Sequence, residues 1–134
     1  MTILYRDSKE IDKEELEHLF LSVEWSSGRY PNELQRAFRN YGAVFTAWDG
    51  NHLVGLVGAI DDKVMTAYVH YLLVDPRYQG QGIGAHMLDL LKQYYAHYLR
   101  IVLIAYPNAI PFYERHGFKG NRAELAMAFT EMDD

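Results

Sequence analysis

A glycine-rich run at residues 79–84, Gln-Gly-Gln-Gly-Ile-Gly, constrains this chain more than any other feature. It follows a strand-like segment at 64–74 and precedes a segment whose apolar residues recur at helical spacing. Alternate glycines carry no Cβ, so a ligand can approach the backbone closely. The first N–H groups of a helix lack intrahelical partners and lie at the positive end of the helix dipole. The run therefore predicts a cradle for a phosphate or pyrophosphate group.

Bulk properties narrow the class of protein. The 134 residues fit one domain, 1–134, which is long enough to bury a core without disulfides or metals. The chain has no cysteine, which excludes disulfides, thiolate nucleophiles and cysteine-based zinc sites. The start shows no signal-peptide pattern and no apolar run is long enough for a membrane span, so we expect a cytoplasmic protein. A net charge of −5 argues against nucleic acid and is compatible with a cationic acceptor such as an amine.

The first part of the chain predicts one short strand and two helices. A strand is expected at 3–6. Asp12 then offers an N-cap, Glu15 completes a capping box, and an amphipathic helix follows. Pro31 begins a second helix, and Gly42 ends it in a C-cap position.

The middle of the chain predicts two hairpins. The β-rich runs 43–48 and 53–60 are joined by Asp-Gly-Asn, a strong hairpin signal. After a second turn, a long strand at 64–74 ends before Pro76, which cannot donate to a ladder.

The last part predicts a strand–helix–strand crossover. A helix is expected at 82–95, and the continuous apolar run 99–105 favours a central strand buried on both faces. Asn108 caps a short helix, and a last strand is expected at 123–130. Together these elements predict an α/β or α+β fold, with a mixed, mostly antiparallel central sheet flanked by helices.

The glycine run alone leaves alternatives open. Gly80-x-Gly82-x-x-Ala85 also satisfies a relaxed dinucleotide fingerprint. That interpretation needs an acidic residue about 20 positions further on, and the strand at 101–105 supplies none. A plain glycine turn before a helix is the other alternative. No Gly-Lys-Ser/Thr sequence is present, which argues against an NTPase.

Two blocks carry a resemblance to a known family. Residues 74–84 resemble the acetyl-CoA signature of the GNAT superfamily of N-acetyltransferases, Gln/Arg-x-x-Gly-x-Gly/Ala, which Gln79, Gly82 and Gly84 match. Residues 108–118 resemble its Phe-Tyr-Glu-Lys-x-Gly-Phe element, with Arg115 in place of the common lysine. Both blocks stand in the family's order, and the order of elements resembles the family's fold over nearly the whole chain.

The resemblance implies a donor site for acetyl-CoA. Pantetheine would lie along the strand before the loop, the pyrophosphate would meet the N–H groups of residues 80–85, and Asn108 would contact the pantetheine arm. The implied set is Leu72, Leu73, Val74, Gln79, Gly80, Gln81, Gly82, Ile83, Gly84, Ala85, Asn108 and Tyr113.

Amine attack on a thioester needs a base for the amine and an acid for the leaving thiolate. The resemblance implies that Tyr113 is the general acid, and that a β-bulge at Leu72 or Leu73 supplies an oxyanion donor. Alternation places His70 on the face of Leu72, and its ordinary pKa suits a base at neutral pH. Glu24 is a rival base, and water is the third.

The segment between the first two helices covers the acceptor in the family, which implies Glu24, Trp25, Arg29 and Tyr30 as substrate-binding residues. Aromatic walls and one carboxylate suit a primary amine, whereas Arg29 suits a substrate with a carboxylate or phosphate. Two alternatives stay open: a non-catalytic acyl-CoA-binding or sensing module, and a peptide or protein acetyltransferase. The histidines show no metal-ligand spacing, so no metal is expected. The family also admits a homodimer.

Overall fold

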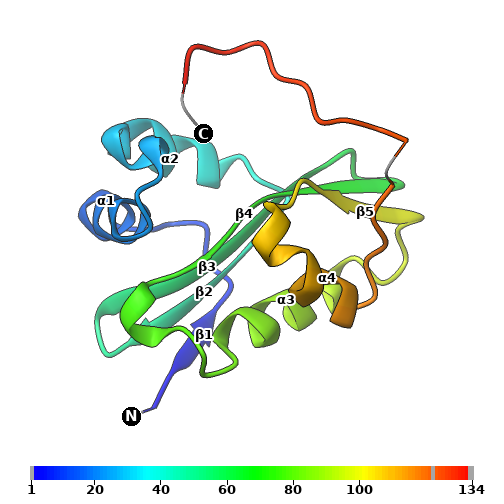
Figure 1. Cartoon of the computed structure of the whole chain (residues 1–134). Helices are drawn as coiled ribbons and strands as arrows, with labels where there is room; N and C mark the ends of the chain where they lie inside the picture. Colours follow the sequence, from blue (N-terminus) through cyan, green and yellow to red (C-terminus); the bar gives the residue numbers. More distant parts are fainter. Residues whose placement is uncertain (1, 122, 133–134) are drawn as a thin grey trace.

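A five-stranded sheet organises the chain in the computed structural model, which describes residues 2–121 and 123–132 (Figure 1). The strands lie side by side in the order β1-β2-β3-β4-β5. Their bounds are β1 Leu4–Arg6, β2 Ala43–Asp49, β3 His52–Asp61, β4 Thr66–Val74 and β5 Arg100–Leu103. The first four strands pair antiparallel and β5 pairs parallel to β4. This confirms the predicted mixed, mostly antiparallel sheet.

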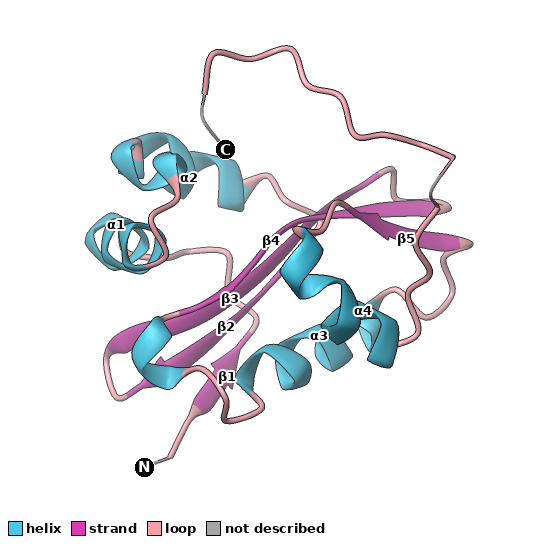
Figure 2. Ribbon diagram, in the orientation of Figure 1, coloured by secondary structure: helices cyan, strands magenta, loops and turns pink. Residues whose placement is uncertain are grey.

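Helices cover both faces of this sheet (Figure 2). The α-helices are α1 Lys13–Ser22, α2 Pro31–Arg39, α3 Ile83–Tyr94 and α4 Ile110–Arg115. The described residues also form three short 3-10 helices: η1 Ser26–Arg29 between α1 and α2, η2 Pro76–Tyr78 between β4 and α3, and η3 Pro107–Ala109 between β5 and α4. Within the described part of the chain, none of the helices has the length and apolar character needed to cross a membrane.

Each face of the sheet holds its own hydrophobic core. On one face, Leu19 and Phe20 of α1 and Phe38 of α2 are fully buried against β2 and β3. On the other face, Met87 and Leu91 of α3 are fully buried. Burying one such side chain stabilises the fold by about 1.5–3 kcal/mol. Helices therefore pack on both faces of the sheet, whereas the edge strand β5 is less covered.

Three predicted caps are corrected by tertiary contacts. Asp12 does cap α1, but the Glu15 carboxylate accepts instead from Leu53 N, 2.9 Å away on β3. Helix α2 ends at Asn40 rather than at Gly42. Gly42 is required for space, because a Cβ there would collide with the carboxylate of Asp61. Asn108 lies inside η3, and Ala109 is the residue that precedes α4.

The prediction of a central strand at 99–105 is wrong about the position of that strand in the sheet. Strand β5 lies at the edge of the sheet and its side chains alternate between exposed and half-buried, Val102 being 41% exposed. An apolar run without alternation does not distinguish an edge strand from a central one.

The predicted strand at 123–130 is also wrong. Residues 123–132 are irregular and exposed, because no neighbouring strand in the described structure supplies their ladder partners.

Candidate active site

The glycine run forms an open turn at the start of α3. Gly80 and Gly82 adopt φ of 81° and 83°, the left-handed region that only glycine enters without strain. Apart from the glycine and its two chain neighbours, no atom of the described residues lies within 4 Å of the place where a Cβ would stand on either residue. The first intrahelical bond of α3 runs from His86 N to Gly82 O at 3.0 Å. The N–H groups of the three residues before His86 therefore have no partner inside the helix.

The residues of the run have different tasks. The Ile83 side chain is buried in the core beneath α3, so only its backbone faces outward. Gln79 folds back and donates from Nε2 to Val74 O at 2.9 Å, which ties the loop to the end of β4. Gln81 is exposed. An anion at this turn would therefore meet backbone N–H groups rather than the glutamine side chains.

The strand before the loop has one open edge. Leu72, Leu73 and Val74 pair with Val57, Leu56 and Gly55 of β3 on one side. On the other side, β5 pairs with β4 only from Thr66 to Val69. Beyond Val69, no strand of the described residues lies beside β4 on that edge, which leaves its backbone open to an extended, amide-bearing ligand.

Helix α4 brings Tyr113 to the side of the glycine loop. A Cβ on Gly84 would lie 3.8 Å from the Phe112 ring and 3.7 Å from Val74, so α4 packs where the loop meets β4. Tyr113 is half-buried between the rings of Phe112 and Phe118, with centroids at 5.1 and 5.8 Å. Burial raises the pKa of Tyr113 above its ordinary value, which keeps its hydroxyl protonated at neutral pH.

A β-bulge lies at His70, and this corrects two predictions. Ala59 of β3 pairs with Val69 and Gly58 pairs with Tyr71, so His70 is the extra residue of β4. The bulge therefore does not fall at Leu72 or Leu73. It also reverses the alternation: Leu72 packs on the α3 side of the sheet, whereas His70 stacks on Tyr71, which packs on the α1 side.

Aromatic rings surround His70. Its ring stacks on Tyr71 at 4.0 Å and on Tyr68 at 5.6 Å, and its Nδ1 lies 2.7 Å from the hydroxyl of Tyr41. Part of the imidazole faces solvent, but these neighbours remove enough water to lower the pKa of His70. Burial raises the pKa of Tyr41, so its hydroxyl stays neutral. His70 is therefore a neutral imidazole near pH 7.

Trp25 extends this aromatic cluster from β4 toward the segment that follows β5. Its ring lies 6.0 Å from Tyr71 and 6.4 Å from Tyr106, which follows β5. Ser27 of η1 lies beside it, with its hydroxyl 2.8 Å from that of Tyr71. Sequence reasoning missed Tyr41, Tyr71 and Tyr106, because only the fold brings Tyr41 and Tyr71 to His70 and Tyr106 to Trp25. Their shared residue type was the only signal.

The other predicted acceptor residues lie elsewhere. Arg29 and Tyr30 line a pocket of about 300 Å³ together with Ser26, Glu131 and Met132. Glu24 is exposed in a left-handed turn after α1, with φ of 61°. The structure thus links Trp25 to His70 through Tyr71, whereas Arg29 and Tyr30 line the pocket beside η1.

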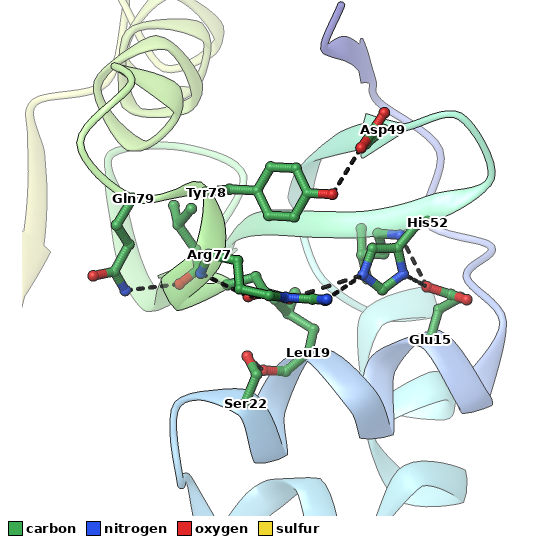
Figure 3. A network of polar contacts seen from close by, with 11 residues as sticks. Glu15, Leu19, Ser22, Asp49, His52, Arg77, Tyr78 and Gln79 are labelled. Carbon is green, nitrogen blue, oxygen red and sulfur yellow. Dashed lines mark hydrogen bonds and ion pairs between the residues drawn. The ribbon is translucent and has the colours of Figure 1, made fainter. Parts of the chain in front are cut away.

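A polar network fixes the segment that leads into the loop (Figure 3). Asp75, 1% exposed, accepts from Arg77 N and from Arg77 Nη2, both at 3.0 Å. His52 links this pair to α1, because its two ring nitrogens lie 3.2 Å from Arg77 Nη2 and 3.1 Å from Glu15 Oε1. The Tyr78 hydroxyl donates to Asp49 at 2.7 Å.

The same network contains a cluster of metal-ligand type. His18, His52 and Asp75 each offer one ligand atom, and these atoms lie within 4.8 Å of one another. The Arg77 guanidinium, however, already bonds Asp75 and contacts His52. A cation would have to displace it, so we treat the cluster as an ion-pair network.

Comparisons of the sequence with known proteins identify its relatives. The sequence model of the Acetyltransferase (GNAT) family matches residues 9–118. An uncharacterized ycf52-like N-acetyltransferase of Prochlorococcus marinus is 31% identical over 133 residues, covering 90% of this chain and 72% of the relative.

Two solved structures share the fold. A GNAT-family acetyltransferase of Streptococcus pneumoniae superposes with a TM-score of 0.84 at 23% identity, over 97% of this chain and 98% of its own. A predicted acetyltransferase of Clostridium acetobutylicum, solved with acetyl-CoA, has a TM-score of 0.67 at 19% identity, over 95% and 96% of the two chains. With the family model covering most of its length, this chain belongs to the GNAT acetyltransferase family.

Proposed function

We propose that this chain, as one domain over residues 1–134, transfers the acetyl group of acetyl-CoA to a primary amine by direct attack. The glycine cradle carries the proposal. Gly80 and Gly82 turn the backbone away from any side chain, and the unpaired N–H groups at the start of α3 attract an anion. The structure from Clostridium acetobutylicum, named with acetyl-CoA, supports the same donor here.

In this proposal the donor lies along two neighbouring surfaces. The pyrophosphate binds the N–H groups from Gly80 to Ala85, and the pantetheine arm follows the open edge of β4 at Leu72, Leu73 and Val74. Asn108 stands in η3, between β5 and α4, and meets that arm from the other side. The thioester then lies near the bulge at His70, where the backbone turns an N–H away from the ladder.

The chemistry follows from the two titratable groups. The amine nitrogen attacks the thioester carbon, and its proton passes to His70 or to water. The C–S bond then breaks and the thiolate takes the proton of the Tyr113 hydroxyl, which solvent restores. For His70 to act, Nδ1–H must donate to the Tyr41 hydroxyl, because this tautomer leaves Nε2 as the free acceptor.

The acceptor site in this proposal is the aromatic cluster around His70. Trp25, Tyr71 and Tyr106 offer faces and edges that suit the methylene groups and the ammonium of a small amine. Glu24, exposed on the turn before Trp25, is placed to attract a cation rather than to take a proton from it. Arg29 and Tyr30 line a neighbouring pocket that receives any acidic or aromatic extension of the substrate.

Two measurements test the proposal. Thermal shift with acetyl-CoA against NAD tests the donor: we expect acetyl-CoA to raise the melting temperature and NAD to leave it unchanged. A shift with NAD alone would instead support dinucleotide binding. Release of free CoA, followed with a thiol reagent over a panel of amines, amino acids and peptides, tests the reaction. If acetyl-CoA binds but no acceptor causes release of free CoA, the protein is an acyl-CoA-binding module. If only peptides cause release of CoA, it is a peptide acetyltransferase.

A further inference from the structure

The glycine loop, residues 79–82, is held at its two ends rather than along its length. Its residues are exposed, and beyond the chain neighbours no atom of the described residues lies within 4 Å of a Cβ place on Gly80 or Gly82. After the loop, Ile83 is buried in the core at the start of α3. Before the loop, the half-buried Tyr78 packs against the same core. The direction of the N–H groups in the loop therefore depends on how firmly these two ends are fixed.

One hydrogen bond ties the leading end of the loop to a distant part of the chain. The Tyr78 hydroxyl donates to Asp49 Oδ2 at 2.7 Å, across 29 positions of sequence (Figure 3). Asp49 is the last residue of β2 and begins the turn of the β2–β3 hairpin. This length is typical of a hydroxyl that donates to an ionised carboxylate, among the stronger hydrogen bonds in proteins. The bond to Asp49 raises the pKa of Tyr78, so the hydroxyl stays a donor at neutral pH.

The residues around Tyr78 hold the other strand of the same hairpin. Arg77 Nη2 lies 3.2 Å from Nε2 of His52, the first residue of β3. Asp75, just before η2, donates from its backbone N to Val54 O of β3 at 2.8 Å. The short helix η2 and its N-cap therefore contact both strands of the hairpin, and the hairpin is the support on which the glycine loop is set.

The geometry points to Asp49 and Tyr78 as positioning residues for the donor: their hydrogen bond orders the glycine loop before acetyl-CoA arrives. This inference rests on the proposed function, in which acetyl-CoA binds the N–H groups of the loop. A loop that is already ordered loses less conformational entropy when its ligand binds, so its affinity is higher. The bond acts through the backbone of residues 79–82. It should therefore change the binding of acetyl-CoA and leave the chemical step alone.

A second bond of the same kind provides a matched control. Tyr95, which follows α3, donates from its hydroxyl to Asp61 Oδ2, also at 2.7 Å. Asp61 is the last residue of β3. Helix α3 thus has a tyrosine–aspartate bond at each end, and only the bond at its start lies beside the glycine loop. Loss of either bond should lower the stability of the fold, whereas only loss of the Asp49–Tyr78 bond should change the loop.

The first test measures the loop in the free protein, without acetyl-CoA. Relaxation of ¹⁵N nuclei gives order parameters for the N–H groups of residues 79–82. We expect about 0.85, the value of rigid backbone, in the wild-type chain and clearly lower values in Tyr78→Phe. Tyr95→Phe should match wild type at these residues. Equal order parameters in wild type and Tyr78→Phe overturn the inference, whatever the donor is.

The second test measures acetyl-CoA binding and turnover. Tyr78→Phe should raise Kd and KM for acetyl-CoA about 5-fold, the scale of one hydrogen bond, and keep kcat at saturation. Asp49→Ala should give the same loss, and the double variant should lose no more, because all three lack the same bond. Asp49→Asn keeps an oxygen acceptor and should recover most of the affinity.

The outcomes separate this inference from the proposed function. An unchanged Kd in Tyr78→Phe, a double variant whose loss is the sum of the two single losses, or an equal loss in Tyr95→Phe overturns the positioning role. If the wild-type chain does not bind acetyl-CoA, the proposed donor is wrong, and the order parameters decide whether the bond holds the loop.

Discussion

At the scale of single residues, Tyr113 and His70 divide the proposed proton transfers between them. Burial raises the pKa of Tyr113 and lowers that of His70, so the tyrosine hydroxyl stays protonated at neutral pH and one ring nitrogen of the histidine stays unprotonated. These directions leave each group in the protonation state that its proposed role requires at neutral pH. Both side chains can be tested singly.

Replacing Tyr113 by Phe removes the proton donor and keeps the ring that packs against Phe112. We expect kcat to fall about 100-fold, the scale of one acid–base catalyst, with acetyl-CoA affinity unchanged. Steady-state CoA release and titration with acetyl-CoA measure the two quantities. Tyr94→Phe, at a tyrosine that is 58% exposed on α3, is the control and should match wild type. Equal turnover in both variants would remove Tyr113 from the mechanism.

His70 should set the acidic limb of the pH–rate profile. A base acts when it is neutral, so kcat/KM should rise with pH through the pKa of His70 and then level off. Because burial lowers that pKa, the rise should be centred below the ordinary value of about 6.5. His70→Gln should lose this limb, and Tyr41→Phe should shift it by removing the partner of Nδ1. A limb that persists in His70→Gln would make water the base.

At the scale of elements, the turn into α3 depends on backbone geometry that side chains cannot supply. Gly82 has φ of 83° and stands directly before the helix. The exposed N–H groups that follow it are useful to an anion only while no Cβ covers them. A substitution at Gly82 should change both the stability of the fold and the affinity for the ligand, and these two effects can be measured separately.

Gly82→Ala should destabilise the chain by about 1 kcal/mol, the cost of an L-residue in the left-handed region, and weaken acetyl-CoA binding about 10-fold or more. Gly50→Ala, in the β2–β3 turn with φ of 60°, carries the same backbone strain away from the cradle. It should lose similar stability while keeping its acetyl-CoA affinity. Chemical denaturation and calorimetric titration compare the pair. Equal losses of affinity would show that strain, and not the methyl group, is responsible.

At the scale of the whole molecule, the hydrogen-bond network around Arg77 connects α1, the β2–β3 hairpin and the segment that leads into the glycine loop. Hydrogen bonds from Arg77 lower the pKa of the buried Asp75 carboxylate below its ordinary value. A carboxyl whose pKa is lowered by folding stabilises the folded state above its ordinary pKa. This contribution is lost as pH falls through the lowered pKa.

Arg77→Met should therefore lower the melting temperature at pH 7, because Asp75 loses the guanidinium that compensates its charge. The difference from wild type should narrow below about pH 4, where the carboxyl becomes protonated. Arg36→Met is the control: Arg36 is exposed and lies 3.9 Å from Glu33 on the same helix. It should change the melting temperature little at any pH. If the difference in melting temperature between wild type and Arg77→Met stayed constant across pH, the charge of Asp75 would not be its cause.

Local sequence determined most of the elements and the glycine turn before α3. Asp-Gly in a turn, proline at a strand end and alternating glycines before a helix act through bonds within a few residues, so no distant contact was needed to interpret them. This is why the two hairpins, helix α3 and its glycine turn were predicted, and why the order of elements gave the correct fold class.

Tertiary structure decided which side chains and strands lie around the glycine turn. The bulge that turns His70 toward Tyr71, the bond that takes Glu15 from its capping box to Leu53, and the edge position of β5 all depend on strands distant in sequence. The alternation at 123–130 gave the intrinsic preference of a strand but no partner. A strand forms only where another backbone completes its hydrogen bonds, and a chain's own sequence does not state which backbone that is.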